Sequence, residues 1–225
     1  MMNGIPKSVR IDEQDYYYEE IYLVNGTKKM NVNIATENLK IFHSLVSQSK
    51  ITYGLFFGTL LGAIREKNFI VHDEDTDIYV LSEDKEKFLS LLFKFKELGL
   101  ILVRCQENLI SLMRADEYID VYFFRPKRKL GFFKVRILEN HNEYSAKNLE
   151  EPVLYHFLGI ELYIPHNPEK ILKELYGKNW RIPIANSPAP YNTFYTKISK
   201  IAPYLKHFPL VRTIQGKLKY ILSKI

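Results

Sequence analysis

The pattern of hydrophobic and polar positions divides the first third of the chain into an arm, a helix, a strand and a second helix. Residues 1–30 are polar and rich in tyrosine, and we expect them to form an extended arm. From Val32 to Val46 apolar residues recur every three or four positions, which indicates an amphipathic helix. The apolar run Ile51–Phe57 predicts a buried strand, and residues 60–67 predict a helix.

The same pattern predicts strands and helices in alternation through the rest of the chain. Ser82 is expected to cap a helix that Gly99 ends. The residues Asn-Pro-Glu at 167–169 favour the start of a later helix, and Gly177 favours its end. Strands are predicted at residues 77–81, 100–106, 109–114, 118–124, 132–138 and 162–164, and a loop at 139–149.

Composition places the chain among globular proteins. A length of 225 residues, 46% of them apolar, is sufficient for one domain with a hydrophobic core. No apolar run approaches the ~20 residues of a membrane-spanning helix, and residues 1–14 lack the apolar segment of a signal peptide. Cys105 is the single cysteine, so an intrachain disulfide and a cysteine zinc cluster are excluded. These features fit the reducing environment of the cytoplasm.

Charge is unevenly distributed, with a strongly basic segment at the C-terminal end. The net charge is +6, yet no Asp or Glu follows Glu174, whereas nine Lys and Arg residues do. The part before this segment is therefore net negative. Residues 193–225 predict short cationic amphipathic helices, which would pack on the domain, lie on a membrane surface or bind nucleic acid.

The acidic run before the strand at 77–81 is the main candidate for chemistry. Side chains alternate in a strand, so Asp75 and Asp77 point to one face while Thr76 and Ile78 point into the packing. Adjacent carboxylates repel each other unless a cation lies between them. Mg²⁺ or Mn²⁺ is preferred where phosphate oxygens complete the coordination. Asp120 is a lone charge in an apolar strand and would supply a third carboxylate if the two strands are neighbours.

The turn before this run provides groups suited to phosphate. Gly58 allows close approach of the backbone, the N–H groups of Gly58 and Thr59 lie at a helix start, and Arg65 is placed to contact a phosphate. Asp73, in the same acidic run, is assigned with them to substrate binding. Two simpler interpretations are a solvated loop and a calcium loop of EF-hand type. The second is disfavoured because Ile78 stands where that loop needs Gly.

These segments resemble a known family. Gly58–Arg65 (GTLLGAIR) and Val71–Ile78 (VHDEDTDI) are similar to the LicD/fukutin-related family, within the polymerase-β-like nucleotidyltransferase superfamily. Tyr176-Gly177, Trp180 and Pro183 are similar to the closing element of that family. The resemblance covers roughly residues 51–80, 118–124 and 162–183.

The chain departs from the family pattern at three positions of the acidic run. His72 stands where the family usually has Trp, Glu74 replaces an Asp, and Thr76 replaces an Ile. The pair Asp75 and Asp77 is retained, so the metal chemistry is not in doubt on this account, whereas His72 alters the expected donor pocket.

The resemblance implies an α+β nucleotidyltransferase fold of polymerase-β type, with a mixed, mostly antiparallel sheet flanked by helices. The catalytic domain would span residues 31–192, between the arm at 1–30 and the basic helical tail at 193–225. Asp75, Asp77 and Asp120 would be the catalytic acids and the ligands of Mg²⁺ or Mn²⁺. Gly58, Thr59, Arg65 and Asp73 would bind the donor.

The resemblance further implies a phosphotransferase. It would move a substituted phosphate, such as phosphocholine or a polyol phosphate, from a CDP-activated donor to a hydroxyl of a cell-surface glycan, in some cases a lipid-linked one. The enzyme is then expected in the cytoplasm, peripheral on the inner face of the cell membrane, with the basic tail on the membrane surface. The sequence leaves open the phosphate substituent, the acceptor sugar and the oligomeric state.

Two other functions use the same residues differently. A nucleotidyltransferase that transfers NMP to RNA or protein, as some toxins do, would keep the same carboxylates. Nucleic acid is not the expected partner, because the chain lacks the interleaved aromatic and basic residues of RNA-binding surfaces. A non-catalytic scaffold at a membrane would have lost one of the three acids, and all three are present.

Overall fold

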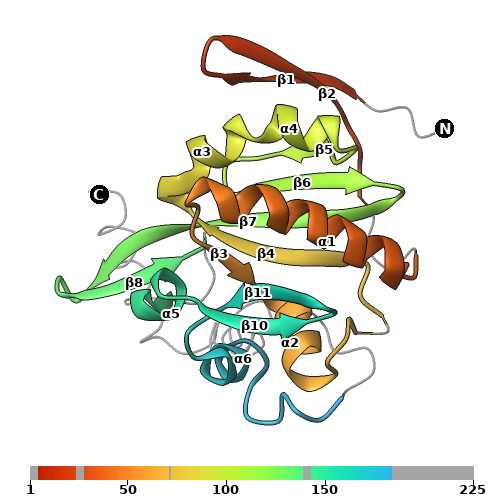
Figure 1. Cartoon of the computed structure of the whole chain (residues 1–225). Coiled ribbons are helices and arrows are strands. Elements are labelled where there is room, and N and C mark those ends of the chain that lie inside the picture. Colours follow the sequence, from red (N-terminus) through yellow and green to blue (C-terminus); the bar gives the residue numbers. More distant parts are fainter. Residues whose placement is uncertain (1–4, 24–27, 71, 139–142, 184–225) are drawn as a thin grey trace, which may run out of the picture. The chain divides into compact units, whose positions relative to one another are not determined.

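The computed structural model describes residues 5–23, 28–70, 72–138 and 143–183 (Figure 1). The strands are β1 (Ile5–Ile11), β2 (Gln14–Glu20), β3 (Tyr53–Leu55), β4 (Asp75–Leu81), β5 (Ile101–Cys105), β6 (Leu109–Arg114), β7 (Glu117–Lys129), β8 (Phe133–Ile137), β9 (Glu143–Ser145), β10 (Val153–Phe157) and β11 (Ile160–Ile164). The helices are α1 (Val32–Val46), α2 (Phe57–Arg65), α3 (Lys85–Ser90), α4 (Leu92–Glu97), α5 (Ala146–Glu150) and α6 (Pro168–Tyr176), with short 3₁₀ turns η1 (Ser47–Ser49) and η2 (Ser82–Asp84).

The central sheet is mixed and mostly antiparallel. Its strand order is β3-β4-β7-β6-β5, and β8 and β9 continue it from the end of β7. β4 and β7 run parallel, whereas the other neighbouring pairs are antiparallel. β4 is buried over nearly its whole length, as expected for an interior strand covered on both faces. The predicted α+β class and sheet type are therefore confirmed.

Amphipathic helices cover this sheet as the apolar spacing predicts. α1 has the predicted bounds and buries Leu39, Phe42 and Val46; Figure 1 shows it lying across β4 and β7. Phe42 stacks on Phe95 of α4, with 5.7 Å between ring centroids, and lies 6.0 Å from Phe88 of α3. α2 packs against β4 and α6, and α6 begins at its Asn167 cap as predicted.

Two segments fold differently from the prediction. Residues 143–150 form β9 and α5 instead of a loop, because Tyr144 and Leu149 are buried in the core. The Tyr79 hydroxyl also donates to the Leu149 carbonyl, at 3.1 Å. β10 was not predicted, because it is largely exposed and shows no alternation of apolar residues. Its pairing with β11 defines it as a strand.

Element boundaries also shift near two of the predicted turns. The strand predicted to reach Phe57 ends at Leu55, because Phe57 already begins α2. Ser82 starts η2 without capping a helix through its side chain, which donates to Glu83 instead, at 3.1 Å. Gly99 has a φ of +83° after α4 and ends this helical segment as predicted.

The N-terminal arm is a β-hairpin that packs on the domain. β1 and β2 pair over their full length, and Tyr16 is buried against Phe93, with 5.2 Å between ring centroids. The Ile21 N–H donates to the Val103 carbonyl at 2.9 Å, at the edge strand β5. The hairpin therefore belongs to the compact unit of residues 1–183.

The predicted tail helices at 193–225 lie outside the described residues and stay a prediction, as does the division of the chain at these boundaries. None of the helices in the described ranges is long and apolar enough to cross a membrane.

Candidate functional site

The parallel pairing of β4 and β7 brings the predicted acids together. Asp77 is directly opposite Asp120 in the ladder, and Asp75 is opposite Tyr118. Asp77 and Asp120 are buried, and Thr76 and Ile78 are buried in the packing as predicted. The prediction that the strands of Asp75, Asp77 and Asp120 are neighbours is therefore confirmed.

Asp77 also holds the start of α2. Its Oδ2 accepts hydrogen bonds from the N–H groups of Gly58 (2.9 Å) and Thr59 (3.4 Å), and its own N–H donates to Thr59 Oγ1 at 2.8 Å. The Phe56 N–H donates to the Asp77 carbonyl at 3.0 Å. In this structure the N–H groups predicted to bind phosphate thus cap the helix on a carboxylate, which suits the positive end of the helix dipole. Their role toward phosphate stays a prediction.

The Asp73 carboxylate leaves no room for a side chain at Gly58. A Cβ at Gly58 would lie 2.7 Å from Asp73 Oδ2 and 2.8 Å from Oδ1, closer than real Cβ contacts. Asp73 Oδ2 is buried with no hydrogen-bond partner among the described residues. An unpaired buried carboxylate oxygen costs folding free energy and indicates a site for a ligand that is positive or a donor.

The strain in this turn is concentrated at Phe57. This residue has a φ of +38°, a conformation that aromatic residues rarely adopt. Its ring packs edge-on against Phe56 and Tyr122, with centroids 4.8 and 5.0 Å away. Packing therefore holds the strained backbone beside the acids, a feature that no sequence pattern indicated.

Burial raises the pKa of each acid, and neighbouring carboxylates add to the shift at Asp75 and Asp77. Burial is the largest cause for all of them. The pKa of Asp73 rises to about 6, although Arg65 opposes the shift. The pKa of Asp75 rises to about 7, with Asp120 as the next cause, and the pKa of Asp77 is raised through Asp75, Asp73 and Asp120. The carboxylates are close enough to interact, and a cation would relieve the repulsion.

Arg104 of β5 is the main site residue that the sequence analysis missed. One of its terminal nitrogens lies 2.8 Å from Asp120 Oδ1 and 2.6 Å from Oδ2, and its Nε donates to Ser111 Oγ at 2.8 Å. Ser111 in turn donates to Asp120 Oδ1 at 2.6 Å. The signal was available, since Arg104 is a charge within a predicted apolar strand, as Asp120 is. Burial raises the pKa of Asp120, and Arg104 opposes that shift.

Arg65 links the site to the segment after α6. It donates to the Trp180 carbonyl at 3.2 Å and pairs with Glu66 at 2.6 Å. Burial, and then the charges of Asp77 and Asp73, raise the pKa of Tyr176 well above its usual value, so Tyr176 also lies near the acids. His72 is exposed, on the turn before the acidic run.

The donor set fits a hard divalent cation in its chemistry. Buried carboxylates that raise one another's pKa surround the site, and Oδ1 of Asp77 takes no part in capping α2. As the side chains stand, however, no three His, Cys, Asp or Glu residues of the described part converge to hold a metal ion. In this arrangement Asp120 pairs with Arg104, and Asp77 caps α2.

Similarity to known proteins follows the same residues. Residues 50–167, more than half of the chain, match the family described as LicD/FKTN/FKRP, nucleotidyltransferase domain. This range includes every predicted site residue and also Arg104 and Ser111.

Three relatives differ in how much of each chain they share with this one. RT0683 of Rickettsia typhi is 30% identical over 185 residues, which cover 80% of this chain and 59% of the relative. RP689 of Rickettsia prowazekii is 26% identical over 205 residues, which cover 90% and 69%. The lipopolysaccharide cholinephosphotransferase LicD of Haemophilus influenzae is 43% identical over 56 residues, which cover 25% and 21%.

Two solved structures are similar to this chain at low scores. The lincosamide antibiotic adenylyltransferase LnuA bound to lincomycin has a TM-score of 0.42 at 15% identity, over 60% of this chain and 82% of that one. The antibiotic-resistance factor ANT(2'')-Ia has a TM-score of 0.48 at 10% identity, over 87% and 100%. Neither score is high enough to support a functional comparison. On the family match, the chain belongs to the LicD/FKTN/FKRP family, and its nucleotidyltransferase domain contains the acidic site between β4 and β7.

Proposed function

We propose that this protein is a phosphotransferase that moves a substituted phosphate, such as phosphocholine or a polyol phosphate, from a CDP-activated donor to a hydroxyl of a cell-surface glycan. The observation that carries the proposal is the placement of Asp77 directly beside Asp120, with Asp75 on the same strand, at the N-terminal end of α2. Family membership and the partial likeness to a lipopolysaccharide cholinephosphotransferase support it.

The site residues have distinct roles in this proposal. Asp75 and Asp77 would hold Mg²⁺ or Mn²⁺, and Asp120 would join them once Arg104 has released it. When bound, the cation supplies positive charge to the donor diphosphate. Arg65 and the freed Arg104 would contact phosphate oxygens, and guanidinium groups suit this task because they bind two oxygens at once.

The reaction is mostly a matter of positioning and charge. The acceptor oxygen attacks the phosphorus that carries the substituent, the bond from that phosphorus to the bridging oxygen breaks, and CMP leaves. Asp120 would accept the proton of the acceptor hydroxyl, because burial raises its pKa and makes it a better base. Such phosphoryl transfers need little covalent participation by the protein.

The product distinguishes this function from nucleotide transfer. The full chain is incubated with a panel of CDP-linked alcohols and MgCl₂, with and without glycan acceptors, and CMP is measured. A parallel series uses nucleoside triphosphates, and pyrophosphate is measured. Acceptor-dependent CMP release from one CDP-alcohol is the expected result. Pyrophosphate release without CMP release would contradict the proposal and favour NMP transfer.

The carboxylates give a sharper test. Asp75→Asn and Asp77→Asn should each lower CMP release by at least about a hundredfold, because the proposed cation would lose one of its carboxylate ligands. The fold should remain, since an Asn oxygen at position 77 can still accept the N–H of Gly58. The exposed Asp116, on the β6–β7 turn, provides the control Asp116→Asn. A normal rate in either site variant, with circular dichroism unchanged, would count against the assignment.

The acceptor is expected to be presented on a lipid carrier at the inner face of the cell membrane, as the sequence analysis suggested. The basic tail would then hold the enzyme on the membrane surface, each Lys or Arg near anionic lipid contributing roughly 1 kcal/mol.

A further inference from the structure

The hairpin formed by β7 and β8 projects beyond the central sheet and ends in an apolar tip (Figure 1). The turn consists of Leu130, Gly131 and Phe132, and Phe133 begins β8. Leu130 is 76% exposed, Phe132 67% and Phe133 55%. The two phenylalanine rings lie 4.3 Å apart by their centroids. The tip therefore exposes three large apolar side chains, two of which lie against each other.

Apolar side chains grouped at a tip call for a functional explanation, whereas single exposed apolar residues do not. Scattered surface hydrophobics are normal, whereas a contiguous patch on a projecting element marks an interaction site or an aggregation hazard. Leu130 and Gly131 both have positive φ, at +51° and +79°. Gly131 adopts this conformation without cost, but Leu130 does not, so the turn keeps an apolar side chain at a position that favours Gly or Asn.

Basic side chains surround the tip. Lys127, Arg128 and Lys129 precede the turn, and Lys134 follows it. Lys127 and Lys129 both pair with the carboxylate of Glu143, at 2.7 and 3.1 Å. The tip thus combines an apolar end with a net positive surround.

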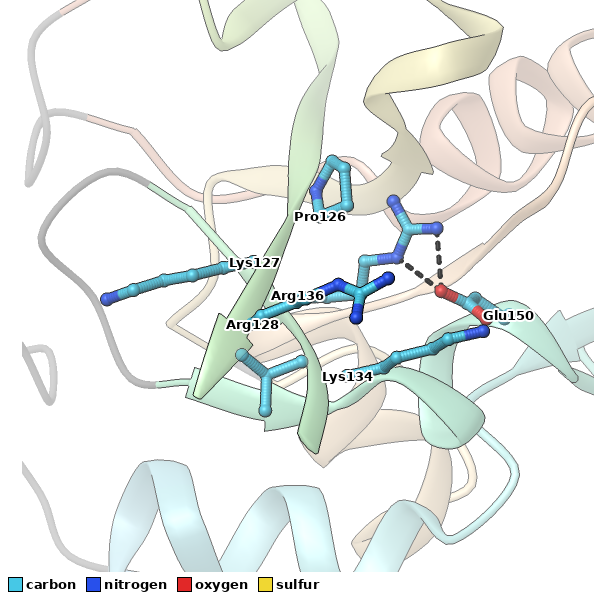
Figure 2. A pocket seen from close by; sticks show the side chains of 7 residues that line it. Pro126, Lys127, Arg128, Lys134, Arg136 and Glu150 are labelled. Carbon is cyan, nitrogen blue, oxygen red and sulfur yellow. Dashed lines mark hydrogen bonds and ion pairs between the residues drawn. The ribbon is translucent and has the colours of Figure 1, made fainter. Parts of the chain in front are cut away.

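The cations lie on both sides of the ribbon. In Figure 2 Lys127 points to one side, whereas Arg128 and Lys134 point to the other. Arg128 and Lys134 line a cavity of about 510 Å³, and its lining also includes Lys127, Arg136 and Glu150. Arg136 is occupied by ion pairs to Glu83 and Glu150, at 2.6 and 2.7 Å.

We propose that the β7–β8 tip docks on an anionic lipid bilayer. Leu130, Phe132 and Phe133 enter the boundary between headgroups and acyl chains, and the surrounding Lys and Arg side chains contact lipid phosphates. This combination of an apolar end and a cationic surround is the pattern of interfacial membrane binding. A flat protein partner would cover one side of the ribbon, whereas a bilayer that receives the tip end-on meets the cations of both sides.

The docking places the candidate site close to the membrane. Asp120 and Leu130 lie on the same strand and its turn, ten residues apart, so at most about 33 Å of extended chain separates them. A site at that distance suits an acceptor that extends from a lipid. This consequence rests on the proposed function, but the docking itself does not, and vesicle binding tests it without any transfer reaction.

The first experiment measures partition of the full chain onto vesicles of equal parts phosphatidylglycerol and phosphatidylcholine. The double variant Phe132→Ser/Phe133→Ser should bind about tenfold more weakly or worse, because two aromatic side chains that would enter the bilayer are lost. Leu154→Ser is the matched control, since Leu154 is an exposed apolar residue on β10. Equal binding of wild type and the double variant, or no binding of wild type, overturns the proposal.

A second pair of variants tests the cations. Arg128→Gln/Lys134→Gln should weaken binding to the anionic vesicles, whereas Lys40→Gln/Lys94→Gln, at exposed lysines of α1 and α4, should not. Salt and pure phosphatidylcholine vesicles should both reduce binding of wild type, because screened or neutral headgroups attract cations less. Binding that is indifferent to lipid charge and to the loss of Arg128 and Lys134 contradicts the proposal.

Insertion of the tip has its own readout. Trp180 is the single tryptophan and is buried. The tryptophan fluorescence of wild type should therefore change little when vesicles are added. Phe132→Trp should show a blue shift and quenching by brominated lipid on the anionic vesicles, and wild type should not. A tryptophan at position 132 that remains unquenched on bound protein shows that the tip stays outside the bilayer and overturns the proposal.

Discussion

Asp77 has two tasks at the scale of single residues. It caps α2 through the Gly58 and Thr59 N–H groups, and it lies in register with Asp120. The same carboxylate therefore fixes the turn and lies beside the proposed third acid. Its neighbours are also acids, and burying several carboxylates together costs folding free energy. Residues that raise the cost of folding and persist together indicate function.

The two glycines of α2 should respond differently to alanine. Gly58→Ala would place a Cβ against the Asp73 carboxylate, which can move, so we expect a loss of CMP release of at least about tenfold with a small change in stability. Gly62→Ala would meet the Asn68 carbonyl at 2.5 Å and the Ile70 nitrogen at 3.1 Å, which are backbone atoms. We expect it to lower the free energy of unfolding by about 2 kcal/mol. Urea unfolding and CMP release are measured on both variants. A larger loss of stability in Gly58→Ala than in Gly62→Ala would refute this prediction.

The raised pKa values predict how stability depends on pH. Burial, with neighbouring charges, raises the pKa of Asp73 to about 6 and that of Asp75 to about 7, above the value of about 3.9 in an unfolded chain. The native state binds these protons more tightly, so their contribution to stability is complete below pH ~4 and is lost as the pH rises to about 7. Asp75→Asn should therefore be more stable than wild type at pH 8 and similar at pH 4.

Magnesium should restore the stability that wild type loses as the pH rises. At pH 8, MgCl₂ should raise the melting temperature of wild type, because the ion binds the folded carboxylates and not the unfolded chain. It should have little effect on Asp75→Asn, and little on wild type at pH 4, where the acids are protonated. Parallel pH profiles of wild type and Asp75→Asn, with no response to the ion, would refute both expectations.

At the scale of elements, β7 connects the two parts of the molecule that we assign to function. Its first half carries Asp120 within the core sheet, and its second half leaves the core to form the hairpin with β8. A single strand of this length keeps a fixed relation between the acid and the tip. The β1–β2 hairpin shows the opposite case, an element that looks polar in sequence yet completes the core.

The N-terminal hairpin should contribute to stability through the first of its three consecutive tyrosines. Tyr16 is 2% exposed and packs on Phe93, whereas its neighbour Tyr17 is 70% exposed. Tyr16→Ala should lower the free energy of unfolding by about 3 kcal/mol because it leaves a cavity. Tyr17→Ala should change it by less than about 0.5 kcal/mol. Urea unfolding of both variants measures the difference, and equal small effects would mean that the hairpin is not docked in solution.

At the scale of the whole molecule, the chain spans 59% of RT0683 and 69% of RP689, so the family assignment applies to the nucleotidyltransferase domain. In membrane binding, two segments that are distant in sequence would act together. The basic tail and the β7–β8 tip are both cationic, and two weak attachments combine to a strong one when both can reach the same surface.

Removal of the tail should weaken vesicle binding without unfolding the domain. A chain that ends at Asn192 retains the compact unit of residues 1–183. It should pellet less with anionic vesicles than the full chain, and its circular dichroism melting should stay cooperative. Equal pelleting of both chains would show that the tail does not contact the membrane, and it would leave the β7–β8 tip to be judged by its own variants.

Much of the fold was readable from local pattern. α1, β6 and the start of α6 match their predicted bounds, because apolar periodicity and capping residues act over a few neighbouring positions. The pair Asp75 and Asp77 and the lone Asp120 were identified in the same way, since a charged residue in an apolar strand can be recognised from the sequence alone. The exposed β10 and the residues of β9 and α5 were not, because their structure depends on partners distant in sequence.

The sequence by itself determined which residues are candidates for chemistry, because residue type, alternation and turn-forming glycine are local properties. Only the tertiary structure decided that β4 and β7 run parallel with Asp77 beside Asp120, that Arg104 pairs with the third acid, and that Asp77 caps α2. Strand order and register bring together atoms that lie dozens of residues apart, and the electrostatic field of the site depends on those distances rather than on the order of residues.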